Sequence, residues 1–392
     1  MKQKNKLETL IIKYKLSYKR FNIFLIFMNI LYILDFYKPN KWWIEILFEQ
    51  IIDHFWKKHK ISIITWNYTQ QLKNIEKQWN ITIYRIKAKN LISYSTKAYL
   101  FAKKIIKDID IIHTSNFYSA FVASRLSKKY KKKSILHINW FFGNYRFKMI
   151  DKIRAYKFKL LEYWNIKWNF DKYIVVSRYM YDVAYFYYWI DNKKLKLIYN
   201  GIDYKKWENN INEEKVKQIQ KKYNLKQTYS LLFYGRIEKV KWINLLLESI
   251  QKIDNIKLLL IVHWDMENLK HTIAQLWIKD KTIIIEWQEH NKIANFIKAV
   301  NVVVFPSLTE SFGYVWLETS ILGTPLICSN IWAIPEVVFW KVNFFNVNDK
   351  KSLINVIEKS KKWDFKQIPY KDLNIKYTLT NIEEVYNELS KK

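Results

Sequence analysis

Short runs of apolar, β-branched residues recur along the chain, and segments with amphipathic spacing separate them. We predict strands over the runs 21–27, 61–65, 81–86, 110–114, 134–138 and 173–177 in the first half, and 230–234, 257–262, 282–285, 302–305 and 325–328 in the second. Between the first two runs, apolar residues from Ile44 to Phe55 keep i, i+3, i+4 spacing, which predicts a helix. Strands that alternate with helices form parallel sheets covered by helices on both faces.

Two sets of strands in 392 residues predict an α/β chain with two doubly wound, Rossmann-like domains. The polar stretch 203–227, rich in Lys, Glu and Asn, separates the sets. We therefore expect an N-terminal domain over 1–203, a second domain over 204–372 and a terminal segment over 373–392, in which 381–389 is helical.

The chain has far more tryptophan and far less glycine than an average soluble protein. The chain has 18 Trp and only 5 Gly, whereas glycine averages about 7% of residues in soluble proteins. Many tryptophans lie at the edges of β-runs or between elements, where tight turns are needed: Trp189, Trp264, Trp277, Trp287 and Trp332. Our hypothesis is that many of them stand for glycine, as when a UGA codon decoded as glycine is read as Trp. The alternative is a Trp-rich protein that stacks indoles on sugars or bases, but its turns would still need glycine.

The formal net charge of +32 suggests an anionic partner. Only seven of the 67 basic residues are arginine, and this argues against nucleic acid, whose readers use arginine forks. Contact with an anionic membrane needs only positive potential and some apolar surface. The single Cys328 excludes an intramolecular disulfide and Cys-rich zinc sites. The apolar run 21–37 is interrupted by polar residues and too short to span a bilayer. We expect a cytoplasmic protein with peripheral contact at the inner face of the cell membrane.

The segment 305–318, FPSLTESFGYVWLE, joins a predicted strand to a helix through a loop with a glycine. Backbone N–H groups at such a helix start favour anions. Glu310 and Glu318 can both face the crevice at the carboxyl ends of the strands, where open α/β sheets bind ligands. Carboxylates accept hydrogen bonds from sugar and ribose hydroxyls. Taken alone, Glu318 also fits a solvated helix residue.

Two further segments lie, like 305–318, in loops that precede a helix. In 234–242, YGRIEKVKW, Arg236 and Lys241 follow a strand and precede a helix, and two fixed cations there can neutralise a diphosphate leaving group. In 38–45, KPNKWWIE, Trp42 and Trp43 lie in a loop just before the first amphipathic helix.

These segments together resemble retaining glycosyltransferases of the GT-B fold, glycosyltransferase family 4, and the resemblance extends from about Phe21 to Leu389. It implies two Rossmann-like domains facing across a cleft, with the terminal helix packed back toward the N-terminal domain. It also implies roles for the residues of the motifs. Glu310 would contact the donor sugar, the backbone of Ser311, Phe312 and Gly313 would meet sugar and phosphates, and Glu318 would hold the ribose. Arg236 and Lys241 would stabilise the leaving diphosphate.

The same resemblance places glycine or a small residue at several tryptophans: Trp42, Trp43, Trp189, Trp242, Trp277, Trp287, Trp316 and Trp332. Trp42 and Trp43 stand for the two glycines that let the first loop approach donor phosphate and acceptor. With indoles at both places, the loop would fill the crevice and activity should fail. Trp207 and Trp363 have no such support and are interpreted as genuine tryptophans.

The sequence departs from the family at a His-x-His pattern, where His113 matches the first histidine and Ser115 replaces the second. His113 fits a satisfied strand-end histidine as well as a site residue, and His137 is interpreted as structural. Asn200 belongs to a further match at the predicted hinge, 200–203.

The resemblance implies a retaining hexosyltransferase of polysaccharide biosynthesis. It would move sugar from a nucleotide-diphosphate donor to a glycan or lipid-linked acceptor, without metal, cofactor or nucleic acid. The alternatives are a catalytically silent GT-B-like binding protein, a basic peripheral membrane binder and, among enzymes, a sugar-phosphate synthase or epimerase.

Overall fold

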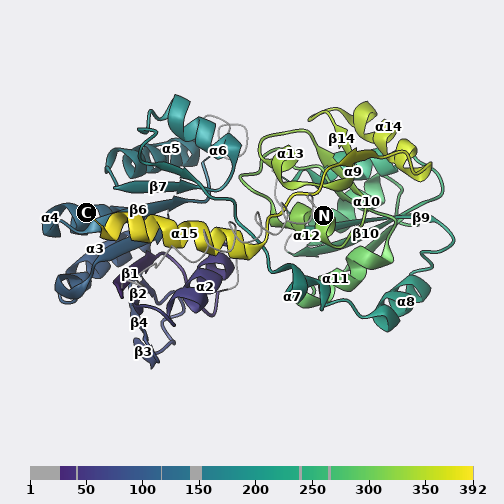
Figure 1. Cartoon of the computed structure of the whole chain (residues 1–392). Helices are drawn as coiled ribbons and strands as arrows, with labels where there is room; N and C mark the ends of the chain where they lie inside the picture. Colours follow the sequence, from purple (N-terminus) through teal and green to yellow (C-terminus); the bar gives the residue numbers. More distant parts are fainter. Residues whose placement is uncertain are drawn as a thin grey trace, which may run out of the picture.

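The computed structural model describes residues 27–40, 43–115, 117–141, 152–237, 241–263 and 266–391. Its two α/β lobes lie side by side, and the C-terminal helix, drawn in yellow, lies across the N-terminal lobe (Figure 1). This arrangement gives the chain the two doubly wound domains that the hydrophobic pattern predicts.

The N-terminal lobe contains an eight-stranded sheet in the order β3-β4-β2-β1-β5-β6-β7-β8, parallel except for the β3–β4 pair. The strands are β1 Asn29–Leu34, β2 Lys60–Trp66, β3 Ile75–Gln78, β4 Ile81–Ile86, β5 Ile111–Ser115, β6 Lys133–Ile138, β7 Lys172–Val175 and β8 Leu195–Leu197. The helices are α2 Trp43–Phe55, α3 Leu91–Ala102, α4 Tyr118–Tyr130, α5 Lys152–Lys167 and α6 Arg178–Asp182, with short turns η1 Ile106–Asp108 and η3 Val183–Tyr187.

The C-terminal lobe contains a seven-stranded sheet in the order β11-β10-β9-β12-β13-β14-β15, parallel except for the β14–β15 pair. The strands are β9 Tyr229–Arg236, β10 Ile256–His263, β11 Thr282–Ile285, β12 Val302–Phe305, β13 Leu326–Ser329, β14 Trp340–Phe345 and β15 Lys366–Ile368. The helices are α7 Tyr204–Glu208, α8 Glu213–Lys222, α9 Ile243–Ile250, α10 Met266–Gln275, α11 His290–Ala299, α12 Tyr314–Ile321, α13 Ile334–Val337 and α14 Lys350–Lys361. Helix α15, Ile375–Ser390, follows.

Ten of the eleven predicted strands are confirmed to within two residues, and the predicted helix from Ile44 to Phe55 is α2. The predicted strand over 21–27 lies outside the described residues except for Phe27, which is not in a strand. The first described strand is instead β1, in the run that polar residues interrupt. Asn29 is its first residue and Asp35 follows its last, so both polar residues flank the strand and leave its apolar centre intact.

Tryptophans occupy backbone positions that favour glycine. Of fourteen non-glycine residues with clearly positive φ in the described part of the chain, seven are tryptophans: Trp79, Trp189, Trp242, Trp277, Trp332, Trp340 and Trp363. The left-handed region costs about 1–2 kcal/mol for a residue with a Cβ. The sequence indicates a genuine tryptophan at position 363, whereas the φ of 58° favours glycine there. Trp207 differs, because it is helical, buried and donates its indole N–H to the Glu318 carbonyl.

The hydrogen bonds and loops around three of these tryptophans are also of kinds that usually contain glycine. Trp277 follows α10, donates its N–H to Ala274, and is followed by Ile278, whose N–H bonds to the Ile273 carbonyl. These two bonds define a Schellman motif, whose left-handed residue is usually glycine. Trp363 ends α14 through an equivalent pair of bonds. Trp79 is the first residue of the two-residue loop between β3 and β4, where type II′ hairpins carry glycine.

The chain passes between the lobes near residues 202 and 374, and these two crossings are hydrogen-bonded to each other. Ile202 donates to the Leu373 carbonyl and accepts from the Ile375 N–H, at 3.2 and 3.0 Å. A Cβ on Gly201 would lie 2.5 Å from the Ile375 nitrogen, so only glycine fits this approach. The domain limits at 203 and 372 stay a prediction.

Helix α15 begins at Ile375, six residues before the predicted start, because Asn374 caps it and its apolar spacing extends back to that residue. Its buried side chains join one core with β1 and α2 of the N-terminal lobe. At the centre of this contact, the Tyr386 hydroxyl lies 2.8 Å from the Tyr32 hydroxyl and 2.6 Å from Nδ1 of His113.

We predict that Tyr386→Phe lowers the free energy of unfolding by about 2 kcal/mol, because it leaves two buried polar groups without their partner. Tyr163→Phe, on an exposed ring, serves as the control and should change the free energy by less than about 0.5 kcal/mol. Denaturant unfolding measures both. Equal effects would show that the Tyr386 hydroxyl adds nothing to the docking of α15.

Candidate active site

The loop between β12 and α12 lies at the carboxyl edge of the C-terminal sheet. Gly313 is its last residue and has φ 91°, which favours glycine. A Cβ on Gly313 would lie 2.5 Å from the Trp316 ring and 3.0 Å from Cγ of Glu310. The loop therefore folds tightly over its own helix. Ser311 and Phe312 are almost fully buried within it.

The strand β9 lies directly beside β12, so the segments that follow these two strands meet at one edge of the sheet. Arg236 is the last residue of β9 and is exposed. Lys241, farther along this segment, places Nζ 3.0 Å from Oε2 of Glu310, and both side chains are 21% exposed. The structure therefore brings together two candidates that are 69 residues apart, in a pair that remains open to solvent.

The aromatic ring of Trp316 lies beneath this pair. It is fully buried in α12, and Nζ of Lys241 lies 5.2 Å from its centroid. This geometry is that of a cation–π contact. Unlike the seven tryptophans with positive φ, Trp316 has helical backbone, so its φ does not favour glycine at this position.

Glu318 is not a solvated helix residue, because its side chain is 0% exposed. Its Oε1 lies 2.8 Å from Nε2 of His290, and its Oε2 lies 2.9 Å from the Tyr234 hydroxyl. The His290 ring also stacks on Trp207, with centroids 4.7 Å apart. The carboxylate is thus held by the buried Tyr234 of β9 and by His290 of α11, whose side chain is 40% exposed. These contacts support a fixed hydrogen-bond acceptor at the sheet edge.

The stability that the His290–Glu318 pair contributes depends on pH. Burial lowers the pKa of His290, but the Glu318 carboxylate raises it more, so the net pKa is above the ordinary value. A raised folded pKa contributes stability that is fully present below the ordinary histidine pKa, about 6.5, and is lost as pH rises through the folded value.

We therefore predict that His290→Gln flattens the fall in stability above about pH 6.5. Denaturant midpoints measured across that range test this. The matched control is His271→Gln, on the exposed surface of α10, which should leave the profile unchanged. A profile that is the same in wild type and His290→Gln would mean that the pair does not titrate as described.

Other predicted residues lie elsewhere. His113 is fully buried in the N-terminal core, where it contacts Tyr386 and stacks on His137 with centroids 5.6 Å apart. This placement favours a core histidine over a site residue, with Nδ1 hydrogen-bonded and Nε2 buried without a hydrogen-bond partner among the described residues. Asn200 is buried near the crossing between lobes, and its amide donates to Oδ1 of Asn139 at 3.4 Å. Trp42 lies outside the described residues, and Trp43 begins α2 with a side chain that is not described.

Sequence reasoning missed two features of the site. Tyr234 and His290 hold Glu318, and the sequence predicts no role for either residue. Glu336 of α13 crosses to the other lobe, where its carboxylate accepts hydrogen bonds from the backbone N–H groups of Arg178 and Tyr179 at 2.6 and 2.8 Å. The two residues that Glu336 contacts lie 158 and 157 positions before it in the chain, so no local pattern predicts these contacts.

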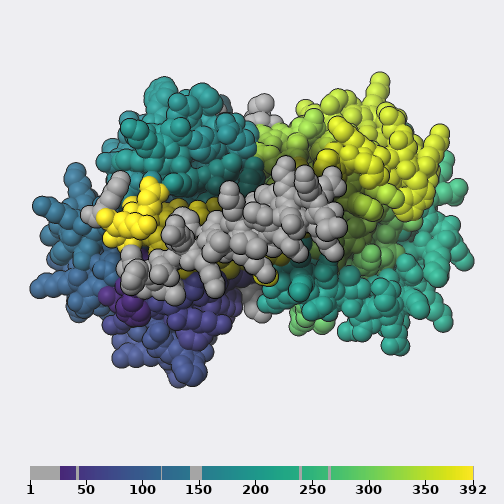
Figure 2. Space-filling view, viewed as in Figure 1, coloured from purple at the N-terminus to yellow at the C-terminus, as the bar shows by residue number. Residues whose placement is uncertain are grey.

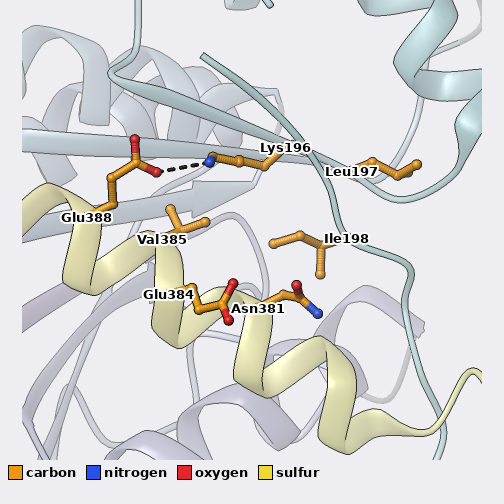
Figure 3. Close-up of a pocket in the computed structure, with 7 residues that line it drawn as sticks. All are labelled: Lys196, Leu197, Ile198, Asn381, Glu384, Val385 and Glu388. Atoms are coloured by element: carbon orange, nitrogen blue, oxygen red, sulfur yellow. Dashed lines mark ion pairs between the residues drawn. The ribbon is translucent and has the colours of Figure 1, made fainter. Parts of the chain in front are cut away.

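A small cavity of about 70 Å³ lies between β8 and α15, away from these residues (Figure 3). The ion pair between Lys196 and Glu388 borders it, with Nζ and Oε2 3.0 Å apart. We regard the cavity as a packing gap beside the docked helix. Among the described residues, no group of three or more His, Cys, Asp or Glu side chains is placed to hold a metal ion.

Comparison with known families agrees with this geometry. The model of glycosyltransferase family 4 matches residues 44–206, and the model of glycosyl transferases group 1 matches residues 215–364. The chain belongs to the GT4-type GT-B glycosyltransferases. The two matches fall on the two lobes, and the motifs that carry Lys241, Glu310 and Glu318 lie inside the second.

Relatives and solved structures support the assignment. This glycosyltransferase is 26% identical over 301 residues to an uncharacterized glycosyltransferase of Methanocaldococcus jannaschii, covering 73% of this chain and 75% of the relative. It is 26% identical over 304 residues to the O-antigen biosynthesis glycosyltransferase WclY of Escherichia coli, covering 73% and 81%. Its fold is similar to that of sucrose-phosphate synthase from Thermosynechococcus elongatus, with TM-score 0.74 and 17% identity over 92% of this chain and 99% of that one. Anabaena HepE in complex with UDP-glucose gives TM-score 0.72 and 12% identity over 92% and 100%.

Proposed function

We propose that this glycosyltransferase is a retaining hexosyltransferase of polysaccharide biosynthesis, which moves sugar from a nucleotide-diphosphate donor to a glycan or lipid-linked acceptor. The observation that carries the proposal is the Lys241–Glu310 pair beside the loop of Gly313, with buried Glu318 on the helix that follows. Relatives named for O-antigen and capsular polysaccharide synthesis support the pathway class. The complex of HepE with UDP-glucose supports the donor class.

The chemistry follows from charge. As the bond between sugar and phosphate breaks, negative charge grows on the diphosphate, and Lys241 and Arg236 would stabilise it there. Preorganised charges at such a position act mainly on the transition state. Glu310 would accept hydrogen bonds from the donor sugar, and Glu318 from the ribose. Lys241 is paired with Glu310 at 3.0 Å, so its ammonium has a fixed position at the sheet edge.

We also propose that the active protein carries glycine at Trp42, Trp43 and Trp242. Trp242 is left-handed at the start of α9, next to Lys241. An indole there adds strain beside the cation that the reaction needs, whereas glycine allows this backbone without cost. Peripheral contact with an anionic membrane is part of the same proposal.

A screen of nucleotide sugars by thermal shift, followed by transfer assays, tests the proposal. The proteins compared are the parent chain and the form with glycine at these three positions. We expect one nucleotide-diphosphate sugar to raise the melting temperature of the glycine form and to serve as donor with retention at the anomeric carbon, observed by NMR. Binding without transfer to glycan, lipid-linked or sugar-phosphate acceptors would instead indicate a catalytically silent binding protein. Inversion at the anomeric carbon would reject the retaining mechanism.

A further inference from the structure

Helix α5 exposes most of its large apolar side chains instead of burying them. Ile153, Tyr156, Leu160, Tyr163 and Trp164 are between 47% and 71% exposed. Their spacing places them along one side of the helix, and we call them the α5 stripe. The buried side of the same helix carries Ala155, Glu162, Asn165 and Ile166. A surface helix of a globular protein normally shows the opposite pattern.

The charges on α5 are all of one sign at the surface. The helix contains five basic residues: Lys152, Arg154, Lys157, Lys159 and Lys167. Its single acidic residue, Glu162, is buried and accepts a hydrogen bond of 2.8 Å from the Tyr188 hydroxyl. Apolar and aromatic side chains flanked by lysine and arginine are typical of helices that lie in a membrane interface.

The neighbouring turn η3 extends this surface. Tyr185, Phe186 and Tyr187 are 39%, 67% and 44% exposed. The Glu162–Tyr188 hydrogen bond ties α5 to the end of this turn. Helices α5 and α6 lie together on the N-terminal lobe (Figure 1), and the teal residues of this part form its upper surface in the space-filling view (Figure 2).

We infer that the α5 stripe and the three aromatic residues of η3 dock the protein on a bilayer rich in anionic phospholipids, with α5 in the plane of the interface. No helix among the described residues is long and apolar enough to cross a membrane. Tyr and Trp favour the headgroup level, where their rings are half-immersed. Each lysine or arginine gains from the negative surface potential.

The charge of α5 indicates that the α5 stripe binds a bilayer and not a second copy of the chain. A symmetric dimer through α5 would bring two basic helices together, in a chain of net charge +32. Like charges opposed in this way repel, whereas an anionic lipid surface attracts them. The inference deepens the proposed function, since a docked enzyme favours a lipid-linked acceptor, but the docking itself does not depend on catalysis.

Co-sedimentation of the full chain with vesicles tests the docking. We expect at least tenfold stronger partition onto vesicles of phosphatidylglycerol and phosphatidylcholine than onto phosphatidylcholine alone, and a steep loss with added salt. The triple variant Tyr156→Ser, Leu160→Ser, Trp164→Ser should reduce the partition at least tenfold. The matched control is Ile92→Ser, Leu100→Ser on α3, where both side chains are also exposed, and it should bind like the parent.

The melting temperature of each variant shows whether it is folded, and sedimentation velocity shows its oligomeric state. The inference is overturned if the stripe variant, folded, binds anionic vesicles as well as the control does, or if the stripe instead holds two copies together. Nucleotide-sugar binding, measured in the same variants without vesicles, separates the two proposals. Lost docking with intact donor binding would overturn the membrane contact and leave the proposed sugar transfer standing. Absent donor binding with intact docking would overturn the proposed sugar transfer and leave the docking standing.

Discussion

Trp277→Gly and Trp363→Gly are each expected to raise the free energy of unfolding by about 1 kcal/mol. Removing a large side chain usually lowers stability, so the sign of the change is diagnostic. Both residues terminate a helix in the left-handed region, with φ of 55° and 58°. Their indoles are 88% and 57% exposed and lose little packing. The relief of about 1–2 kcal/mol of backbone strain then exceeds the added entropy of glycine in the unfolded chain.

Trp207→Gly is the control with the opposite sign. Trp207 is buried in α7, donates to the Glu318 carbonyl and stacks on His290. Its replacement is expected to cost about 4 kcal/mol, because it removes a buried ring and leaves a cavity. Urea unfolding of the three variants supplies the comparison. If all three destabilise the protein, the left-handed positions carry genuine tryptophan.

The covalent test is independent of stability. If UGA encodes glycine in the source organism, peptides of the native protein that cover positions 277 and 363 will show the mass of glycine by tandem mass spectrometry. A tryptophan mass at both positions would exclude reassignment there.

Lys241→Ala is expected to reduce the rate of sugar transfer by roughly 10²–10³-fold, the range seen when a preorganised group that stabilises developing charge is removed. The pair with Glu310 places the ammonium at the carboxyl edge of the sheet. The loss should fall mainly on kcat, because the charge on the diphosphate grows as the bond breaks. Steady-state kinetics with the donor found in the thermal-shift screen measures it.

The matched control for Lys241 is Lys270→Ala. Lys270 pairs with Glu267 at 2.9 Å, so it has the same charge chemistry on an exposed part of the C-terminal lobe. Its loss should leave the rate within a factor of two. Both changes belong in the form with glycine at positions 42, 43 and 242, because the chain with indoles at positions 42 and 43 is expected to be inactive. A Lys241→Ala enzyme as fast as Lys270→Ala would remove Lys241 from the proposed catalytic residues.

The central strands were predictable because buried parallel strands are continuous apolar runs. Strands such as β10 and β12 have this form, and their predicted ends lie within one residue of the observed ones. Five described strands were not predicted: β1, β3, β8, β14 and β15. Of these, β3 and β15 are short, mostly polar edge strands, with exposed residues along IEKQ and at the start of KQI. Their pairing depends on neighbours that the local sequence does not reveal.

The sequence predicts the site residues that lie in contiguous motifs. It does not predict the contacts between site residues that are far apart in the chain. The segments that carry Lys241, Glu310 and Glu318 are each contiguous, so their chemistry was visible in the sequence. The hydrogen bonds that fix the Glu318 carboxylate come from residues that are distant in the sequence. Tyr234 lies 84 residues before it and His290 lies 28 before it. Only the order of strands in the sheet brings these side chains together.

The two hydrogen-bonded crossings at Ile202 and Ile375 restrict how the enzyme can open and close. Two separate linkers would let the lobes slide and twist independently. Two linkers joined edge to edge bend as one ribbon, so the lobes swing about a single axis past Gly201. A donor that draws the C-terminal lobe inward therefore bends this ribbon, while α15, which emerges from it, stays anchored in the core of the N-terminal lobe.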